Sequence, residues 1–97
     1  MQVPVVEVPV SGELDLASAP PLRAALHECI EAHPGAEVLV DLSKLTFIDS
    51  SGLGLLVGAL KKARAAGGDL RVVRCPARLR PAFDVTSLDR VFRMDAA

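Results

Sequence analysis

Hydrophobic residues in this chain recur with two periods, one typical of strands and one typical of helices. Three short apolar runs predict strands over residues 3–10, 37–42 and 70–73. In the first run Val6, Val8 and Val10 fall on one face. Pro4 and Pro9 lack the N–H group that a strand ladder needs, so we expect this strand at an edge of its sheet.

Two longer stretches have the spacing of amphipathic helices. The first begins after Ser18, a candidate N-cap, and ends at His33-Pro34-Gly35. Its apolar face consists of Leu22, Ala25, Leu26, Cys29 and Ile30. The second covers residues 52–66, with an inner stripe of Leu53, Leu56, Val57 and Leu60, and ends at Gly67-Gly68. A short third helix over 76–85 and a last strand over 90–94 complete an alternation that favours βαβ units with parallel strands.

The polar turn Asp49-Ser50-Ser51-Gly52 lies between the second strand and the second long helix. The first N–H groups of a helix have no intrahelical partner, and the helix dipole is positive there. A hydroxyl at this junction is therefore suited to carry a phosphate. The alternative is that Ser50 simply caps the helix.

Composition limits the classes of function. The chain has 97 residues, which predicts one domain over 1–97, and its aromatic content of 3% with no Tyr or Trp argues against stacking on bases. Its net charge of −1 gives no attraction to nucleic acid. Residues 1–50 hold eight acids and two bases, and residues 51–97 hold nine bases and four acids, which indicates either steering of a protein partner or ordinary solvated faces.

Catalytic, metal and membrane signals are missing from the sequence. Cys29 and Cys75 are isolated, and Cys29 is expected in the core. The longest apolar stretch, residues 53–60, is too short to span a bilayer. The chain also has no nucleophile elbow and no phosphate loop, and neither His27 nor His33 is placed to serve Ser50. We expect a cytoplasmic protein that is not an enzyme and needs no cofactor.

Three segments resemble landmarks of one family. The segment 47–54, Phe-Ile-Asp-Ser-Ser-Gly-Leu-Gly, resembles the phosphorylation-site signature of bacterial anti-sigma factor antagonists, which are STAS domains. The segments 11–15 and 88–92 resemble the family's loop before the first helix and its usual ending. The resemblance implies an α/β fold, a single small domain with a mixed, mostly parallel sheet and helices packed on it. The family's extra first strand is missing or shortened here, so an uncovered edge could pair with a second copy to form a homodimer.

The resemblance also implies a function. The unphosphorylated form would bind an anti-sigma factor that is itself a serine kinase, and so release a sigma factor. Phosphorylation would switch the protein off, with Ser50 as the acceptor and Ser51 as the second candidate, and a serine phosphatase would reset it. The alternative is a STAS domain that does not switch, acting as a subunit of a lipid-transport ATPase or of a stress-signalling assembly.

The expected partner-binding residues surround the start of the second long helix; they are Asp15, Asp49, Ser51, Gly52, Gly54 and Leu55. Asp49 either caps the helix or docks, and Asp15 either contacts the partner or serves only the turn. Glycine is costly inside a helix, which suggests close approach of another backbone. We expect that approach to be by a partner at Gly52 and Gly54 and by the protein's own fold at Gly58. Leu55 lies off the inner stripe, so we expect it to be exposed.

Overall fold

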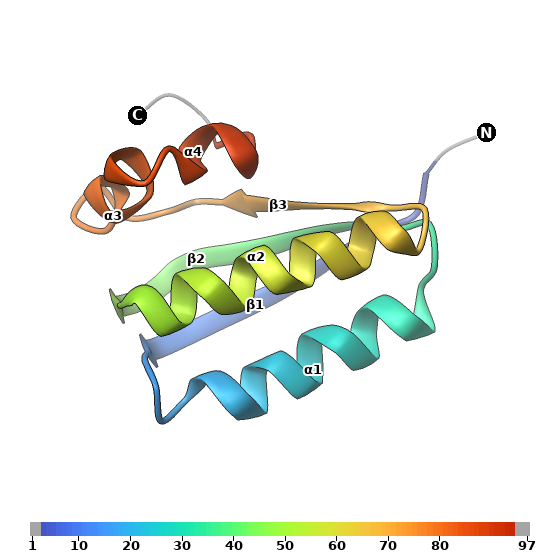
Figure 1. Cartoon of the computed structure of the whole chain (residues 1–97), viewed down its shortest axis with the longest axis horizontal. Coiled ribbons are helices and arrows are strands. Elements are labelled where there is room, and N and C mark those ends of the chain that lie inside the picture. The colour runs from blue at the N-terminus through green and yellow to red at the C-terminus, as the bar shows by residue number, and fades with distance from the viewer. Residues whose placement is uncertain (1–2, 95–97) are drawn as a thin grey trace.

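The computed structural model describes residues 3–94, which form a three-stranded sheet with helices packed against one of its faces (Figure 1). The elements in chain order are β1 (Val5–Leu14), α1 (Ala19–Ala32), β2 (Glu37–Ile48), α2 (Ser50–Ala65), β3 (Asp69–Val73), α3 (Arg80–Val85) and α4 (Leu88–Val91). The strands lie in the order β1-β2-β3 and both pairs are parallel, as the alternation of strands and helices predicts. Figure 1 shows α1 and α2 side by side on the sheet, and α3 with α4 near the end of β3.

The first two strands are longer than predicted. Residues 11–13, expected in the loop before the first helix, belong to β1, which continues to Leu14 and pairs with β2 as far as Ile48. Two register shifts interrupt this pairing, and Gly12 adopts a φ of 79°. The hydroxyl of Thr46 donates to the carbonyl oxygen of Gly12 at 2.9 Å, which ties the irregular part of the two strands together. Both strands therefore reach the start of α2.

The last element among the described residues is a helix, and the predicted strand over 90–94 is wrong. Residues 88–91 form α4, and the third helix begins at Arg80 rather than at 76. Phe92 is fully buried and packs edge-on against Phe83, with 6.1 Å between the ring centres. This anchoring of Phe92 in the core, rather than the local apolar pattern, decides the conformation of the segment.

Helix α2 buries a wider face than its sequence stripe predicts. It contacts α1 as well as β2 and β3, so residues on two sides of the stripe are covered. Leu55 is only 2% exposed, and the prediction that it is an exposed apolar contact is wrong. Helix α1 buries a narrower face than its sequence predicts. Cys29, which was expected in the core, is only half-buried, and Ala25 is exposed. The predicted ends of both helices are confirmed within two residues.

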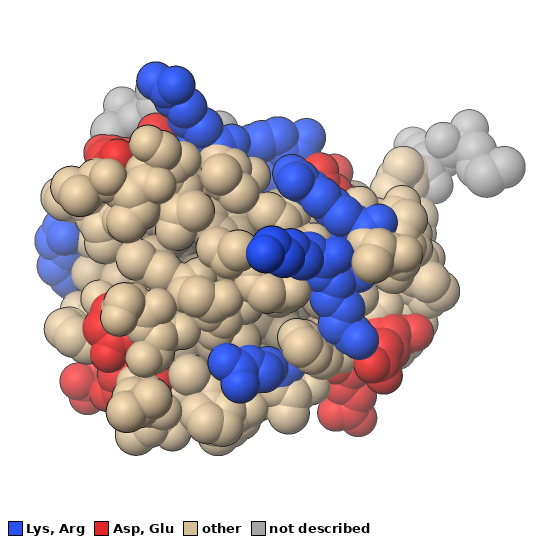
Figure 2. Space-filling model, viewed as in Figure 1, with Lys and Arg blue, Asp and Glu red and all other residues tan. Residues whose placement is uncertain are grey.

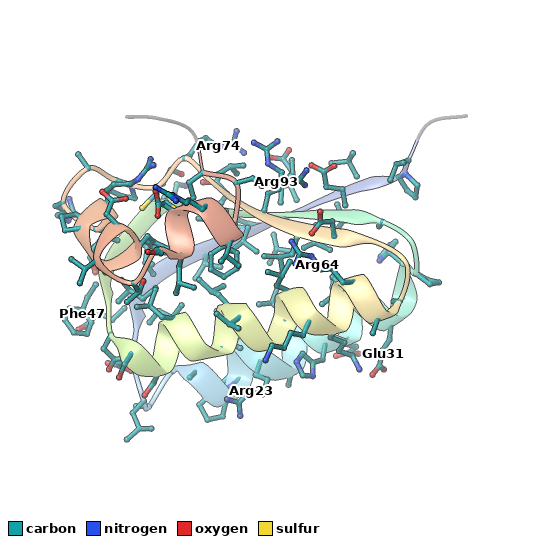
Figure 3. All side chains as sticks on the ribbon, turned by 45° about the horizontal axis from the view of Figure 1, so that its top comes forward. Arg23, Glu31, Phe47, Arg64, Arg74 and Arg93 are labelled. Carbon is teal, nitrogen blue, oxygen red and sulfur yellow. The ribbon has the colours of Figure 1, made fainter. Side chains whose placement is uncertain are left out.

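Charged side chains of the two halves of the chain meet on the folded molecule. Arg74 lies between Glu7 of β1 and Asp41 of β2, with its Nε 2.8 Å from the Asp41 carboxylate (Figure 3). Lys62 of α2 pairs with Glu31 of α1 at 2.9 Å. Exposed pairs of this kind contribute little to stability, because solvent screens them. Part of the charge asymmetry thus serves pairing within the fold.

The edges of the sheet bear on association with other chains. Among residues 3–94 no strand precedes β1, and β1 pairs with β2 alone. Its other edge is therefore not paired within this part of the chain, and a homodimer through that edge remains a prediction. No helix in the same range is long and apolar enough to cross a membrane.

Candidate functional site

Asp49 forms the N-cap of α2. Its backbone is extended, with φ −120° and ψ −172°, and its Oδ1 accepts hydrogen bonds from the N–H groups of Ser51 at 2.9 Å and Gly52 at 3.1 Å. Its carbonyl oxygen accepts the first helical bond, from the N–H of Leu53 at 3.0 Å. Of the two interpretations of Asp49, the structure supports the cap.

Ser50 is the first residue of α2, and its side chain is exposed. The alternative that Ser50 caps the helix is wrong, because Asp49 holds that position. The hydroxyl of Ser50 makes no hydrogen bond with any residue in the range 3–94. Ser51 is half-buried, and its N–H is occupied by the cap. The structure thus gives Ser50 a free, outward hydroxyl with no part in holding the fold.

Gly52 is required by the fold itself. A Cβ atom at this position would lie 2.7 Å from Leu14 Cγ, 2.9 Å from Ile48 Cγ1 and 2.9 Å from the Leu14 carbonyl oxygen. The same carbonyl accepts the N–H of Asp49 at 3.2 Å, so it is fixed in place. Gly52 is also buried, and the prediction that it faces a partner is wrong.

The other two glycines of α2 lie on the surface. A Cβ atom at Gly54 or Gly58 would meet nothing within 4 Å, and both residues are exposed. The predicted internal packing of Gly58 is therefore wrong. Gly54 leaves open space at the surface, and its contact with a partner backbone stays a prediction; nothing in the fold requires a glycine there.

Two shallow depressions flank Ser50, and Ser50 lines both. The first, of about 420 Å³, lies between α1 and α2 and is lined by Leu16, Ala19, Pro20, Arg23, Ser50, Ser51, Gly54 and Leu55. The second, of about 400 Å³, lies between α2 and α3 and is lined by Ile48, Asp49, Ser50, Leu53, Pro81, Ala82, Val85 and Thr86. Figure 2 shows an area free of charged side chains over the first half of α2, with basic side chains over its second half. Apart from Arg23 and Asp49, the residues that line the two depressions are uncharged, and a surface of this kind is suited to protein contact.

The loop before α1 is held by hydrogen bonds that the Asp15 side chain accepts. Asp15 Oδ1 accepts the N–H of Ala17 at 3.1 Å and the N–H of Ser18 at 3.0 Å, and the N–H of Asp15 donates to the Ser18 hydroxyl oxygen at 2.9 Å. The Ser18 hydroxyl also lies 2.7 Å from the carbonyl oxygen of Glu13, to which it donates. The backbone hydrogen bond from Ser18, first among several, lowers the pKa of Asp15. The structure supports the interpretation that Asp15 serves the turn. The Ser18 side chain bonds within this loop and not to the N–H groups of α1.

Three exposed apolar side chains near this site were not among the residues predicted to bind a partner. Leu16 is 76% exposed at the tip of the loop before α1, Phe47 is 45% exposed at the end of β2, and Val85 is 85% exposed on α3 (Figure 3 labels Phe47). Single exposed apolar residues are common, but here Leu16 and Val85 each line a depression that Ser50 also lines. No local pattern in the sequence distinguishes these three residues, because each has other apolar residues within three positions in the chain.

Comparison with known proteins assigns the chain to one family. The family model described as "STAS domain" matches residues 2–97, and the chain belongs to this family. It is 35% identical to the anti-sigma-B factor antagonist of Bacillus subtilis over 91 residues, covering 94% of this chain and 82% of that protein. It is 30% identical to the anti-sigma F factor antagonist of Paenibacillus polymyxa, covering 90% of this chain and 74% of that protein.

Solved structures agree with this assignment. The unphosphorylated anti-sigma factor antagonist SpoIIAA superposes with a TM-score of 0.81 at 25% identity, covering 99% of this chain and 82% of that one. An anti-sigma factor antagonist from Mycobacterium paratuberculosis superposes with a TM-score of 0.82 at 31% identity, covering 96% and 78%. The STAS domain of a SulP transporter from Vibrio cholerae shares the fold, with a TM-score of 0.70 at 13% identity.

Proposed function

We propose that this protein is an anti-sigma factor antagonist whose activity is switched by phosphorylation of Ser50. The observation that carries the proposal is the free, exposed hydroxyl of Ser50 at the start of α2, between two depressions, with the cap supplied by Asp49. The names of its relatives in B. subtilis and P. polymyxa support the same class of function. The partner is an anti-sigma factor that is a serine kinase, and a serine phosphatase reverses the modification.

The unphosphorylated surface around Ser50 is suited to docking. Leu16 on one side and Val85 on the other project from their elements, and Gly54 leaves room for a close backbone between them. Because Leu16 stands on a loop held by Asp15, little conformational entropy is lost when a partner covers it. Leu16, Ser50, Gly54 and Val85 together define the proposed docking surface.

Phosphorylation acts on this surface through charge. A phosphate on Ser50 adds about −1.5 to −2 charges at pH 7 between two depressions whose linings are mostly uncharged. A partner that covers it would have to remove water from a dianion, which is expensive without matching cations. The Ser50 side chain supports nothing in the fold, so the switch needs no refolding.

Phosphosite mapping tests the assignment. The wild-type protein, Ser50→Ala and Ser51→Ala are incubated with candidate anti-sigma kinases and ATP, and the products are mapped by mass spectrometry. We expect labelling of the wild type and of Ser51→Ala, and loss of labelling in Ser50→Ala. Ser43, which is exposed on β2 and lines neither depression, gives a matched control, Ser43→Ala, that keeps full labelling. Full labelling of Ser50→Ala would refute the assignment.

A further inference from the structure

A phosphate on Ser50 would lie beside helix N–H groups that are already occupied. Ser51 and Gly52 both donate to Asp49 Oδ1, so these two donors are not available to the phosphate. The Asp49 carboxylate is itself negative and adjoins Ser50 in the chain. The expectation that the helix start by itself stabilises the phosphate is therefore weakened, and a cation from another element is needed.

Arg23 is placed to supply that cation. It lies in the second turn of α1, is exposed, and lines the depression of about 420 Å³ that Ser50 also lines. Figure 3 shows it on α1, below the ribbon of α2. Within the part of the chain that the structure describes, Arg23 has no ion pair and no side-chain hydrogen bond, in contrast to Lys62 and Arg74. Its guanidinium is thus uncommitted in the unphosphorylated protein.

The space between the two residues is open. Gly54, one helical turn after Ser50, has no atoms within 4 Å of where its Cβ would be. The side chains of Ala19 and Leu55, both almost fully buried, line the same depression and carry no charge that would compete for a guanidinium. No other lysine or arginine lines either depression beside Ser50. Lys61 of α2 is exposed, but 11 residues along a helix place it about 16 Å from Ser50.

We propose that Arg23 binds the phosphate of phosphorylated Ser50 and so forms an ion pair across the depression between α1 and α2. The proposal rests on Ser50 being the phospho-acceptor. Guanidinium presents paired N–H donors that match phosphate oxygens, so the pair is directional as well as charged. It places the phosphate and the Arg23 side chain over Gly54, on the proposed docking surface. The phosphorylated form is then closed to the partner by an occupied groove as well as by added charge.

The test uses protein that carries phosphoserine at position 50, installed during translation, so that no kinase is required. The second pKa of the phosphate, ordinarily about 6, is measured by ³¹P NMR titration in the wild type and in Arg23→Gln. A nearby cation favours the dianion, so we expect a pKa about 0.5 unit lower in the wild type than in Arg23→Gln at low salt. The difference should shrink near 1 M salt, where the screening length is about 3 Å.

Two further variants separate pairing from net charge and from unfolding. Arg90→Gln removes the same charge from an exposed residue of α4 that lines neither depression, and it should leave the phosphate pKa as in the wild type. Arg23→Lys should retain part of the shift. The unphosphorylated Arg23→Gln protein should melt as the wild type does, because Arg23 has no partner among residues 3–94.

Equal phosphate pKa values in the wild type and Arg23→Gln would overturn the proposal, and so would an equal shift in Arg90→Gln. Neither result bears on whether Ser50 is the natural acceptor, since the phosphate is installed without a kinase. Conversely, full kinase labelling of Ser50→Ala would refute the switch at Ser50 and remove the biological role of the pair. The ³¹P titration would still measure the pair itself.

Discussion

Replacing Gly52 by alanine tests whether the start of α2 is fixed by close packing within the fold. The new methyl group would lie 2.7 Å from Leu14 Cγ and 2.9 Å from Ile48 Cγ1. Those side chains can shift, but the Leu14 carbonyl oxygen, also 2.9 Å away, belongs to the backbone and accepts the N–H of Asp49. Relief of the clash therefore has to move α2 away from the end of β1.

The size of the effect follows from two opposing contributions. An extra methyl group in a packed region costs about 1–3 kcal/mol, and exchanging glycine for alanine inside a helix returns up to about 1 kcal/mol. We expect Gly52→Ala to lower the free energy of unfolding by about 1–2 kcal/mol. For a domain of this size that corresponds to a fall in Tm of about 4–16 °C.

Two substitutions on the same helix are matched controls with the opposite sign. Gly54→Ala and Gly58→Ala meet nothing within 4 Å, so each should raise the free energy of unfolding by about 0.5–1 kcal/mol. Urea denaturation and calorimetry of the three variants measure the contrast. If Gly52→Ala proves as stable as Gly54→Ala, the close approach of α2 to β1 does not constrain this position and the reasoning fails.

Three other expectations concern the cap, the switch and acid stability. Asp49→Ala should lower the free energy of unfolding by about 1 kcal/mol and Asp49→Asn by much less, as measured by thermal melting, because only alanine loses the cap to Ser51 and Gly52. Ser50→Asp should weaken partner binding in titration calorimetry without lowering Tm, and a lowered Tm with unchanged affinity would contradict the mechanism. The pKa values of Asp15 and Asp41 are lowered, mainly by backbone hydrogen bonds, below the ordinary 3.8. The stability these groups contribute is therefore present above pH 3.8 and lost as pH falls through their folded pKa values, so Asp41→Asn should flatten the fall in Tm as the pH drops below 3.8.

Local sequence determined the order of the elements from β1 to α3 and the ends of both long helices. Pro20-Pro21 suits a first helical turn, and Gly67, with a φ of 86°, follows the end of α2. These signals act between residues close together in the chain, so they depend little on contacts with distant segments. The signature around Ser50 is local in the same sense, and it located the start of α2 within two residues.

Tertiary contacts decided features that local patterns left open. The continuation of β1 through Leu14 depends on pairing with β2, more than thirty residues away in sequence. Phe92 lies in a helical turn region because its ring fills the core beside Phe83. Leu55 is buried because α1 and the sheet both cover α2. In each case, contacts between distant segments outweigh weak local preferences.

Some features of the candidate site also follow from local sequence, and others depend on tertiary packing. Asp49 as a cap follows from the residue types at a helix start, and the exposed hydroxyl of Ser50 follows from that cap. The neighbours of Ser50 do not follow from local sequence, because Leu16 comes from the loop before α1 and Arg23 from α1 itself. The packing of α1 against α2 determines which side chains share a depression with Ser50, and that packing is a property of the whole core.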